Sequence, residues 1–420
     1  MEGKGGLPSA VIAALDAKDD AQLKVLAAYY REISPVYAPL RKQIAAARKE
    51  LGKVKEAAST TVMVMQELEE RRPTFMLNRG QYDQPGEEVE PGIPAAFGAL
   101  PEGAPNNRLG FAQWLVDPAN PLPARVTMNR FWQSYFGVGL VKTVDDFGAQ
   151  GEFPSHPELL DWLATEFVAS GWDVKAMQKL IVMSATYRQK SAIPEKLLES
   201  DPENRLIARG PRFRLPGPAI RDQALAISGL LNEDIGGPSV KPYQPAGLWE
   251  EVGGRKGLVY KPGSGDDLYR RSMYTYWKRA VAPPTMIIFD AGTRERCDVA
   301  RRSTNTPLQA LATLNDVQFV EAARFLGERM MLEGGDSPVE RLAYGWRLAL
   351  AREPDDTELA TLTNGFDKHL DHYKSNPTAA EQIRAIGGKP AAAEIDTAEH
   401  AAYTAIANLI LNLDETITRE

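Results

Sequence analysis

The chain is poor in cysteine and histidine, and it contains no long apolar run. Its 420 residues include one cysteine and four histidines, so no internal disulfide can form within it. No Cys-x-x-Cys-His motif is present, which excludes attachment of a c-type haem to this chain in the usual way. No stretch of about 18 uninterrupted apolar residues occurs, so the sequence predicts no transmembrane helix.

Common catalytic and nucleotide-binding motifs are also absent. The sequence holds no glycine-rich phosphate loop, His-Glu-x-x-His pair or Gly-x-Ser-x-Gly elbow. The net charge is −7 and no long Lys/Arg run exists, which argues against nucleic acid as the main partner. The first twenty residues lack the apolar core of a signal peptide. They fit a cytoplasmic chain, or a fragment of an exported protein whose signal lay upstream.

What is present is the composition of a globular protein. Hydrophobic residues make up 43% of the chain and charged residues 25%, and the length allows two or three domains. We predict a mainly α fold, a multi-helix globular domain with a small β component and long irregular loops, preceded by an N-terminal helical hairpin. The expected boundaries are a hairpin at 1–58, short strands and a Gly/Pro-rich connector at 59–105, and the helical domain at 106–420.

The predicted hairpin shows a narrow apolar seam at three- and four-residue spacing, which is typical of coiled-coil packing. Its members are Leu23, Leu26, Tyr30, Ile33, Val36, Leu40, Ile44, Leu51 and Val54. The β-branched and alternating runs at 60–66 and 73–77 predict strands. We expect the arm to pack on another surface or to project with part of its seam exposed.

Capping residues followed by proline mark most of the predicted helices. Helices are expected over 125–136 and after Ser155, Asp173, Gly217, Thr306, Asp316, Ser337 and Asp396, the last running to Leu413. The segment 233–268 is rich in Gly and Pro and predicts a long irregular excursion.

Long stretches of the chain resemble one protein family. The run NNRLGFAQWLVDPANPLPARVTMNRFWQSYFGVGL is followed in the same order by SATYRQKS, RLPGPAIRDQAL, YRRSMYTYWKR and CDVARRSTNTPLQALATLND. Together they resemble the C-terminal domain of unknown function, of PSD type, in large planctomycete-type cytochrome c proteins. The resemblance covers nearly all of residues 60–420.

The resemblance implies an order of domains and a cellular location, but no reaction. In that family a haem-bearing cytochrome c-like domain and a second helical domain precede this one, and the protein is exported. The hairpin at 1–58 is then the tail of an upstream connecting region, and the location is periplasmic or otherwise extracytoplasmic. Haem is expected only on the missing upstream domain, which is the expected partner, and this chain is expected to bind no cofactor.

A loop of mixed acidic and imidazole groups precedes the helix predicted after Ser155. Asp146, Glu152 and His156, with Asp145, offer ligands for a metal or a shared proton. The same groups are favoured beside a helix N-terminus for structural reasons. With one imidazole and no cysteine nearby, we favour the structural role and predict no metal site.

Two arginine pairs flank the apolar segment 281–289, which is expected to resemble a hairpin. Arg270-Arg271 and Arg301-Arg302 offer forks that match carboxylate, phosphate or sulfate, and they suit an anionic glycan or haem propionates. The alternative, which we favour, is pairing in buried networks. Further arginines and their candidate partners are Arg130, Arg188, Arg212, Arg221, Asp146, Asp222, Asp290 and Asp316.

Three other groups have both a chemical and a structural explanation. Cys297 lies near cationic residues that would lower a thiol pKa, but no base is close in sequence and free cysteine is usually buried. The aromatic run YRRSMYTYWKR suits a sugar-stacking platform, although a strand beside a core is favoured. His369 and His372 share one face of a predicted helix, where a solvated face is favoured.

Two functions therefore stay open. The first is a non-haem accessory or binding module of an exported cytochrome-type protein, handling an anionic polysaccharide. The alternative is an enzyme domain with its own active site between loop 145–156 and segment 296–316. The candidate site residues are Asn129, Arg130, Asp146, Glu152, His156, Arg270, Arg271, Cys297, Arg301, Arg302 and Asn305. Convergence of Asp146, His156, Arg301 and Asn305 in one open pocket would favour the enzyme.

Overall fold

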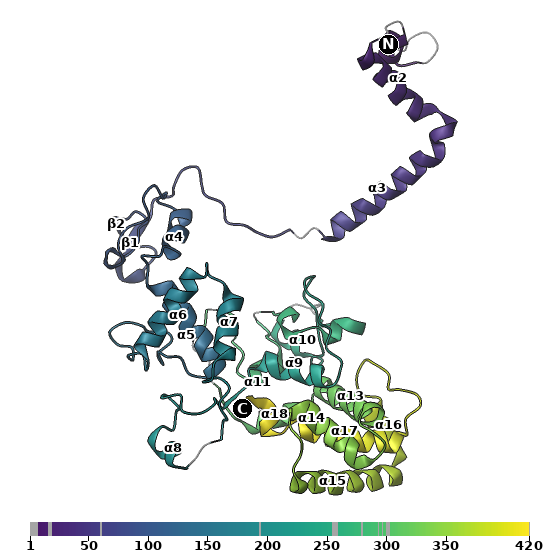
Figure 1. Ribbon diagram of the computed structural model, residues 1–420. Coiled ribbons are helices and arrows are strands. Elements are labelled where there is room, and N and C mark those ends of the chain that lie inside the picture. Colours follow the sequence, from purple (N-terminus) through teal and green to yellow (C-terminus); the bar gives the residue numbers. More distant parts are fainter. Residues whose placement is uncertain are drawn as a thin grey trace. The chain divides into compact units, whose positions relative to one another are not determined.

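The computed structural model divides the chain into two compact units, Met1–Pro91 and Gly92–Glu420 (Figure 1). The described residues are 7–15, 19–58, 61–192, 195–253, 259–278, 280–292, 294–295, 297–299 and 303–419. Helices dominate these residues and strands are short, so the predicted mainly α class is confirmed. Among the helices described, none is both long enough and apolar enough to cross a membrane. The domain boundaries predicted at residues 58 and 105 stay predictions.

The first unit begins with three described helices, of which the second and third correspond to the predicted hairpin and the first was not predicted. They are α1 (Ser9–Leu15), α2 (Asp20–Ile33) and α3 (Ala38–Ala58), with the 3-10 turn η1 (Pro35–Tyr37) between the last two. Asp19 caps α2 by accepting a hydrogen bond from the Gln22 amide at 2.8 Å. Where the chain turns, Arg41 donates to the carbonyls of Arg31 and Ser34.

The apolar seam of this arm is exposed. Leu23, Leu40 and Val54 keep 54%, 51% and 57% of their surface accessible, and no residue of α2 is buried. Caps and backbone hydrogen bonds therefore hold α2 and α3, and burial of the seam adds little to their stability.

The strand predicted at 60–66 is wrong for its described part, residues 61–66, which form no regular structure. Its alternating pattern finds no neighbouring strand to complete the backbone hydrogen bonds, and its side chains are exposed. The second prediction is confirmed in part, since β1 (Phe75–Leu77) pairs antiparallel with β2 (Pro85–Glu88). The 3-10 turn η2 (Asn78–Gly80) lies between them.

The second unit opens with a group of helices around a core of its own. They are η3 (Ala95–Phe97), α4 (Arg108–Leu115), α5 (Leu122–Phe136), α6 (Pro157–Ala169), α7 (Val174–Met183) and α8 (Glu195–Ser200). Met128, Leu163, Phe167 and Ile181 form the centre of the core that α5, α6 and α7 share. The helix expected over 125–136 is confirmed as α5.

The start of α6 differs from the prediction that Ser155 is its cap. His156 holds the N-cap position and makes no side-chain capping bond, while the Ser155 amide donates to the Leu140 carbonyl at 2.8 Å. Pro157 explains the shift, because the residue before a proline is pushed out of the helical region. At the next helix the prediction is confirmed, since Asp173 accepts from the Ala176 amide at 3.0 Å.

The rest of the second unit is a larger helical group closed by a short strand pair. Its elements are β3 (Phe213–Arg214), α9 (Gly217–Ile227), α10 (Leu248–Gly253), η4 (Gly265–Tyr269), η5 (Ser272–Tyr274), α11 (Pro284–Ile288), α12 (Pro307–Asn315), α13 (Val317–Glu333), α14 (Pro338–Leu350), α15 (Asp356–Ser375), α16 (Pro377–Arg384), α17 (Thr397–Leu411), α18 (Asp414–Ile417) and β4 (Thr418–Arg419). β3 and β4 pair antiparallel, Phe213 with Arg419.

Helices α13 and α17 form the centre of this group. A Cβ at Gly327 would lie 2.9 Å from the Thr404 amide nitrogen, so glycine is what allows the two backbones to approach. Ala322, Ala323 and Ala402 have no exposed surface at this contact. Small residues therefore make the interface close and dense.

The predicted caps in this group are confirmed. Asp316 accepts from the Gln318 amide at 3.0 Å, Ser337 forms a capping box with Glu340, and Asp396 caps α17. Thr306 is the N-cap of α12, and its amide donates to Gln309 Oε1 at 3.2 Å. Helix α17 ends at Leu411, two residues before the predicted end.

Two predicted elements between α9 and α12 are wrong. The run YRRSMYTYWKR is not a strand: η5 tightens it, with the Tyr274 amide donating to the Arg271 carbonyl, and only single bridges such as Val240 with Thr275 remain. The segment 281–289 contains α11 and no hairpin. Both sequences have strand composition, but no continuous partner strand lies beside them among the described residues.

Candidate functional site

The polar groups of loop 145–156 form hydrogen bonds within the loop and with the neighbouring Thr143. Asp146 Oδ1 accepts from the Gly148 amide at 2.7 Å, and its carbonyl accepts from the Thr143 hydroxyl at 2.8 Å. Glu152 is exposed, and its amide donates to the same Thr143 hydroxyl. His156 Nδ1 lies 3.1 Å from the Ser155 hydroxyl. Among the residues that the structure describes, no three His, Cys, Asp or Glu side chains are placed to hold a metal.

Asn129 and Arg130 lie side by side on α5 but face different surroundings. Asn129 has no exposed surface, and its amide group donates to the Val141 carbonyl at 2.9 Å and accepts from the Val141 amide at 2.8 Å. It therefore fixes the chain that leaves α5. Arg130 is exposed and lines a cavity of about 350 Å³ together with Phe213 and Asp298.

The segment 296–316 fastens α11 to α12 and α13. Asp290, whose φ of +60° lies in the left-handed region, accepts from the amide and hydroxyl of Thr304 at 2.8 Å and pairs with Arg214. Burial lowers the pKa of Arg214 below its usual range, and the charge of Asp290 opposes this. Thr285 donates to Asp316 Oδ2 at 3.0 Å. The polar groups of this segment are thus mostly occupied within the fold.

Two of the remaining candidates of this segment are described by the structure. Cys297 and Asn305 are exposed, and Asn305 makes no side-chain hydrogen bond with any described residue. Arg301 and Arg302 lie outside the described residues. Among the four groups whose convergence would favour an enzyme, Asp146 and His156 are held in their own turn and Asn305 faces solvent.

Arg270 and its neighbours belong to a buried network. Arg270 donates to the carbonyls of Asp234, Gly236 and Pro238, and its guanidinium lies 3.9 Å from the centroid of the Tyr274 ring. Backbone carbonyls and an aromatic face therefore occupy the group expected to bind an anion. Arg271 differs, because its buried Nε has no hydrogen-bond partner.

Arg221 is the centre of this network and is almost fully buried. It donates to Gln318 Oε1 at 2.7 Å and to the carbonyls of Arg270 and Leu268 at 2.8 Å. Burial lowers the pKa of Arg221, and the neighbouring Asp222 opposes this. These contacts match the structural alternative, in which buried arginines are paired.

A second buried network surrounds Glu321 of α13, which has no exposed surface. Its carboxylate accepts from the hydroxyls of Tyr243 at 2.9 Å and Tyr269 at 2.8 Å, and from the amides of Gly388 and Lys389. Burial, with the carboxylate beside it, raises the pKa of Tyr243 to about 12 and that of Tyr269 further. Tyr269 thus points into the core, so the aromatic run does not form one flat platform.

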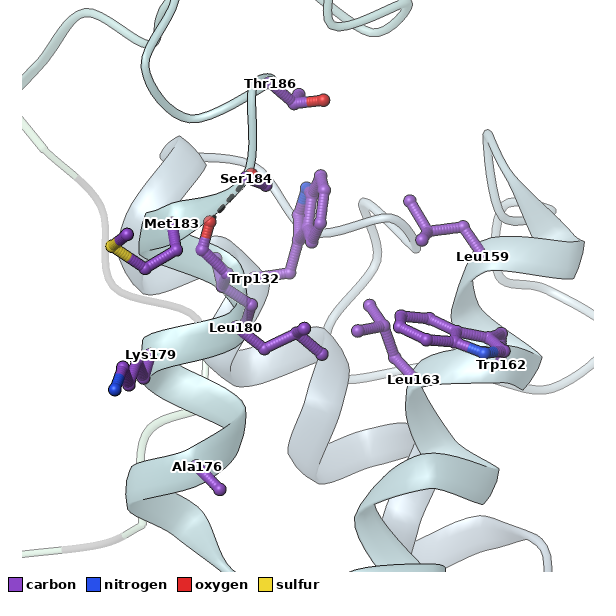
Figure 2. Close-up of a pocket in the computed structure, with 11 residues that line it drawn as sticks. Trp132, Leu159, Trp162, Leu163, Ala176, Lys179, Leu180, Met183, Ser184 and Thr186 are labelled. Atoms are coloured by element: carbon purple, nitrogen blue, oxygen red, sulfur yellow. Dashed lines mark hydrogen bonds between the residues drawn. The ribbon is translucent and has the colours of Figure 1, made fainter.

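The structure reveals an apolar groove between α6 and α7 that sequence reasoning missed (Figure 2). Its volume is about 700 Å³. Its walls are formed by Trp132, Leu159, Trp162, Leu163, Ala176, Lys179, Leu180, Ile181, Met183, Ser184 and Thr186. Figure 2 shows Leu180 on α7 facing Leu163 and Trp162 on α6, with the Trp132 ring above them.

The groove lacks the groups that catalysis needs. No carboxylate, imidazole or thiol lines it, and Lys179 is its one charged residue. The Ser184 hydroxyl donates to the Ile181 carbonyl at 2.7 Å, so it is already occupied. The sequence carried one signal for this surface: the run LLDWLATEF places apolar residues around more of α6 than a single buried face requires.

The chain was compared with known proteins and families. Residues 107–366 match the family model PSD1, whose description is "Protein of unknown function (DUF1553)". The match confirms the family resemblance that the sequence motifs indicated. No curated protein and no solved structure matches the chain.

Proposed function

Because the chain belongs to the PSD1 family of proteins of unknown function (DUF1553), we propose its function from its own surface. We propose a non-catalytic accessory module that binds an amphipathic helix of a partner protein in the groove between α6 and α7. One observation carries this proposal. Trp162, Leu180 and Met183 are 49%, 40% and 57% exposed on helices that already share a packed core.

The shape and lining of the groove support a helix as the ligand. A volume of about 700 Å³ is enough for several apolar side chains, and residues of α6 and α7 form most of the walls. An amphipathic helix inserts anchors at positions i, i+3 or i+4, and i+7 into such a groove. Burial of the exposed tryptophan and leucine contributes about 25 cal/mol for each Å² of apolar surface removed from water.

Exposed charges on α6 and α7, which apart from Lys179 lie outside the groove lining, specify the polar edges of that helix. Glu158 and Glu166 are exposed on α6, and Lys175 and Lys179 are exposed on α7. None of the four has an ion-pair partner among the described residues. A helix with basic residues along the edge facing α6 and acidic residues along the edge facing α7 is therefore complementary.

The resemblance supplies a source for the partner. We propose that the helix belongs to the cytochrome c-like domain upstream in the same protein, that the assembly is extracytoplasmic, and that haem is held by the upstream domain alone. These statements rest on the resemblance of the sequence motifs. The anionic polysaccharide is a separate proposal with a separate surface.

Calorimetric titration of the chain with the separately produced upstream haem domain tests the proposed function. Leu180→Asp places a charge in the groove and is expected to weaken binding at least tenfold. Leu308→Asp is the matched control, because Leu308 is 60% exposed on α12 and lies outside the groove lining. Absence of binding, or equal weakening by both variants at unchanged thermal midpoints, would refute the proposal.

A further inference from the structure

A cluster of two lysines and three aromatic rings joins the irregular excursion 233–268 to the segment that follows it before α11. The Trp249 ring centroid is 5.6 Å from Lys241 Nζ and 4.4 Å from Lys278 Nζ. Tyr260 and Tyr276 contact the same indole, with ring centroids 5.2 Å and 5.9 Å away. We name these five residues the Trp249 cluster.

The backbone holds this cluster in place although its members are far apart in sequence. The Tyr276 amide donates to the Val240 carbonyl at 2.7 Å, which sets the chain of Lys278 beside that of Lys241. The Tyr260 hydroxyl donates to the Pro242 carbonyl at 2.6 Å. The arrangement is therefore built into the fold and does not depend on long side chains alone.

The charge of the cluster is not balanced. Both lysines approach one indole, and among the described residues neither has an ion pair or a hydrogen bond to a carboxylate. Glu250 and Glu251 follow Trp249 in sequence but are exposed and pair with neither lysine. Aromatic faces attract each ammonium, yet the two like charges repel each other. A bound anion would remove that repulsion.

Buried N–H groups without acceptors lie in the same excursion and just after it. Within residues 233–268 they are Trp249 Nε1 and Gln244 Nε2, and just after it they are Arg270 Nε and Arg271 Nε; none of these atoms has a hydrogen-bond partner. Trp249 is 6% exposed, so its indole N–H is shielded from bulk water. All four groups are donors, and a ligand that satisfies any of them must offer acceptors. An oxyanion has only acceptors and carries the charge that the lysines lack.

We propose that the Trp249 cluster binds an oxyanion attached to a sugar, as in an anionic polysaccharide. The two lysines take the sulfate or carboxylate group, and the Tyr276 ring, which is 39% exposed, packs on the apolar face of the sugar. Free inorganic anions share the first part of this chemistry but not the second. The proposal is independent of the groove between α6 and α7.

The test is a calorimetric titration of the full chain with dextran sulfate, uncharged dextran and inorganic sulfate. Dextran sulfate is expected to bind, and binding should weaken as salt is raised because the site is partly exposed. Lys278→Ala and Lys241→Ala are each expected to weaken it at least tenfold, and Lys278→Arg to preserve it. Lys261→Ala is the matched control, since Lys261 is an exposed lysine of the same excursion with no charged partner among the described residues.

Each contrary outcome would refute one part of this proposal. Equal weakening by Lys261→Ala would show non-specific attraction to positive charge. Equal binding of uncharged dextran would remove the role of the anion. Displacement by inorganic sulfate at matched sulfate concentration, with Tyr276→Ala unchanged, would remove the role of the sugar. Leu180→Asp should leave dextran sulfate binding intact, so failure of the groove proposal is distinguishable, and thermal melts show that each variant is folded.

Discussion

The helix pair α13–α17 is closed, whereas the helix pair α6–α7 is open on one side. At the first, Gly327 and fully buried alanines bring the backbones together and leave no room for a ligand. At the second, large side chains such as Trp162 and Leu180 meet at the core edge and remain 49% and 40% exposed. Small residues thus build a structural interface, whereas large uncovered ones are the basis of the proposed binding surface.

Buried polar groups also differ from one region to another in whether their hydrogen bonds are satisfied. The buried carboxylate of Glu321 has four hydrogen-bond donors, which is what a charge within a core requires. The indole N–H of Trp249 has no acceptor, and the two lysines beside the ring have no counter-charge among the described residues. A satisfied network supports the fold, while an unsatisfied one beside solvent is a candidate site.

The largest expected effect is in the closed pair. Glu321→Ala removes the acceptor of two tyrosine hydroxyls and leaves Arg324, which has no exposed surface, without its carboxylate. Breaking a buried charge pair by removing one partner costs about 3–5 kcal/mol of unfolding free energy. Urea unfolding followed by circular dichroism measures this. Glu394→Ala, at an exposed position, is the control and should change little; a loss below about 1 kcal/mol for Glu321→Ala would contradict the structural role.

In the group formed by α5, α6 and α7, Asn129 is a fully buried polar residue, and replacing it should lower the free energy of unfolding by a comparable amount. Asn129→Ala leaves the amide and carbonyl of Val141 buried without partners, and each unsatisfied group costs about 1–3 kcal/mol. The two groups together give an expected total of about 2–6 kcal/mol in urea unfolding. Ser134→Ala is the matched control on the exposed face of α5. Equal stability of the two variants would show that Asn129 does not fix the loop.

The closed pair should also confer a pH dependence. His400 on α17 has no exposed surface, and burial lowers its pKa, although its Nε2 contacts the Arg324 carbonyl at 2.9 Å. The unfolded chain binds a proton there below about pH 6.5, whereas the folded chain binds it only at lower pH, so stability falls as pH drops through this range. The slope is at most about 1.4 kcal/mol per pH unit.

Urea midpoints at pH 7.5 and pH 5.5 measure this dependence. The unmodified chain should lose stability at the lower pH, and His400→Leu should reduce the difference between the two midpoints. His372→Gln, at an exposed position of α15, should keep the full difference. An unchanged difference in the His400 variant would assign the pH dependence to other groups.

Local signals in the sequence predicted much of this fold. Asp173, Asp316 and Ser337 cap helices because the first turn of a helix has unpaired amides, and proline follows Ser337 at the first helical position. The strand expected at 60–66 failed because pairing needs a distant partner that no local pattern contains.

The proposed binding surfaces were harder to predict, because they too depend on contacts between residues that are distant in the sequence. Arg270 looked like an anion ligand, but backbone carbonyls, which have no sequence signature, occupy it. The Trp249 cluster joins residues 241 to 278 through long-range contacts. The excess apolar width of α6 was visible in LLDWL, yet only the packing of α5 and α7 decides which of those residues stays uncovered.

The smallest expected change in unfolding free energy is that of Leu180→Ala, and it is compared with the larger change for Leu163→Ala in the same groove. Leu163 and Leu180 both line it, but Leu163 is 2% exposed and Leu180 is 40% exposed. Leu163→Ala should cost about 2–5 kcal/mol, because it leaves a cavity in the core. Leu180→Ala should change the unfolding free energy by less than about 0.5 kcal/mol while weakening the binding of the partner helix. If Leu180→Ala destabilises the chain as much as Leu163→Ala, the groove is part of the core and the docking proposal falls.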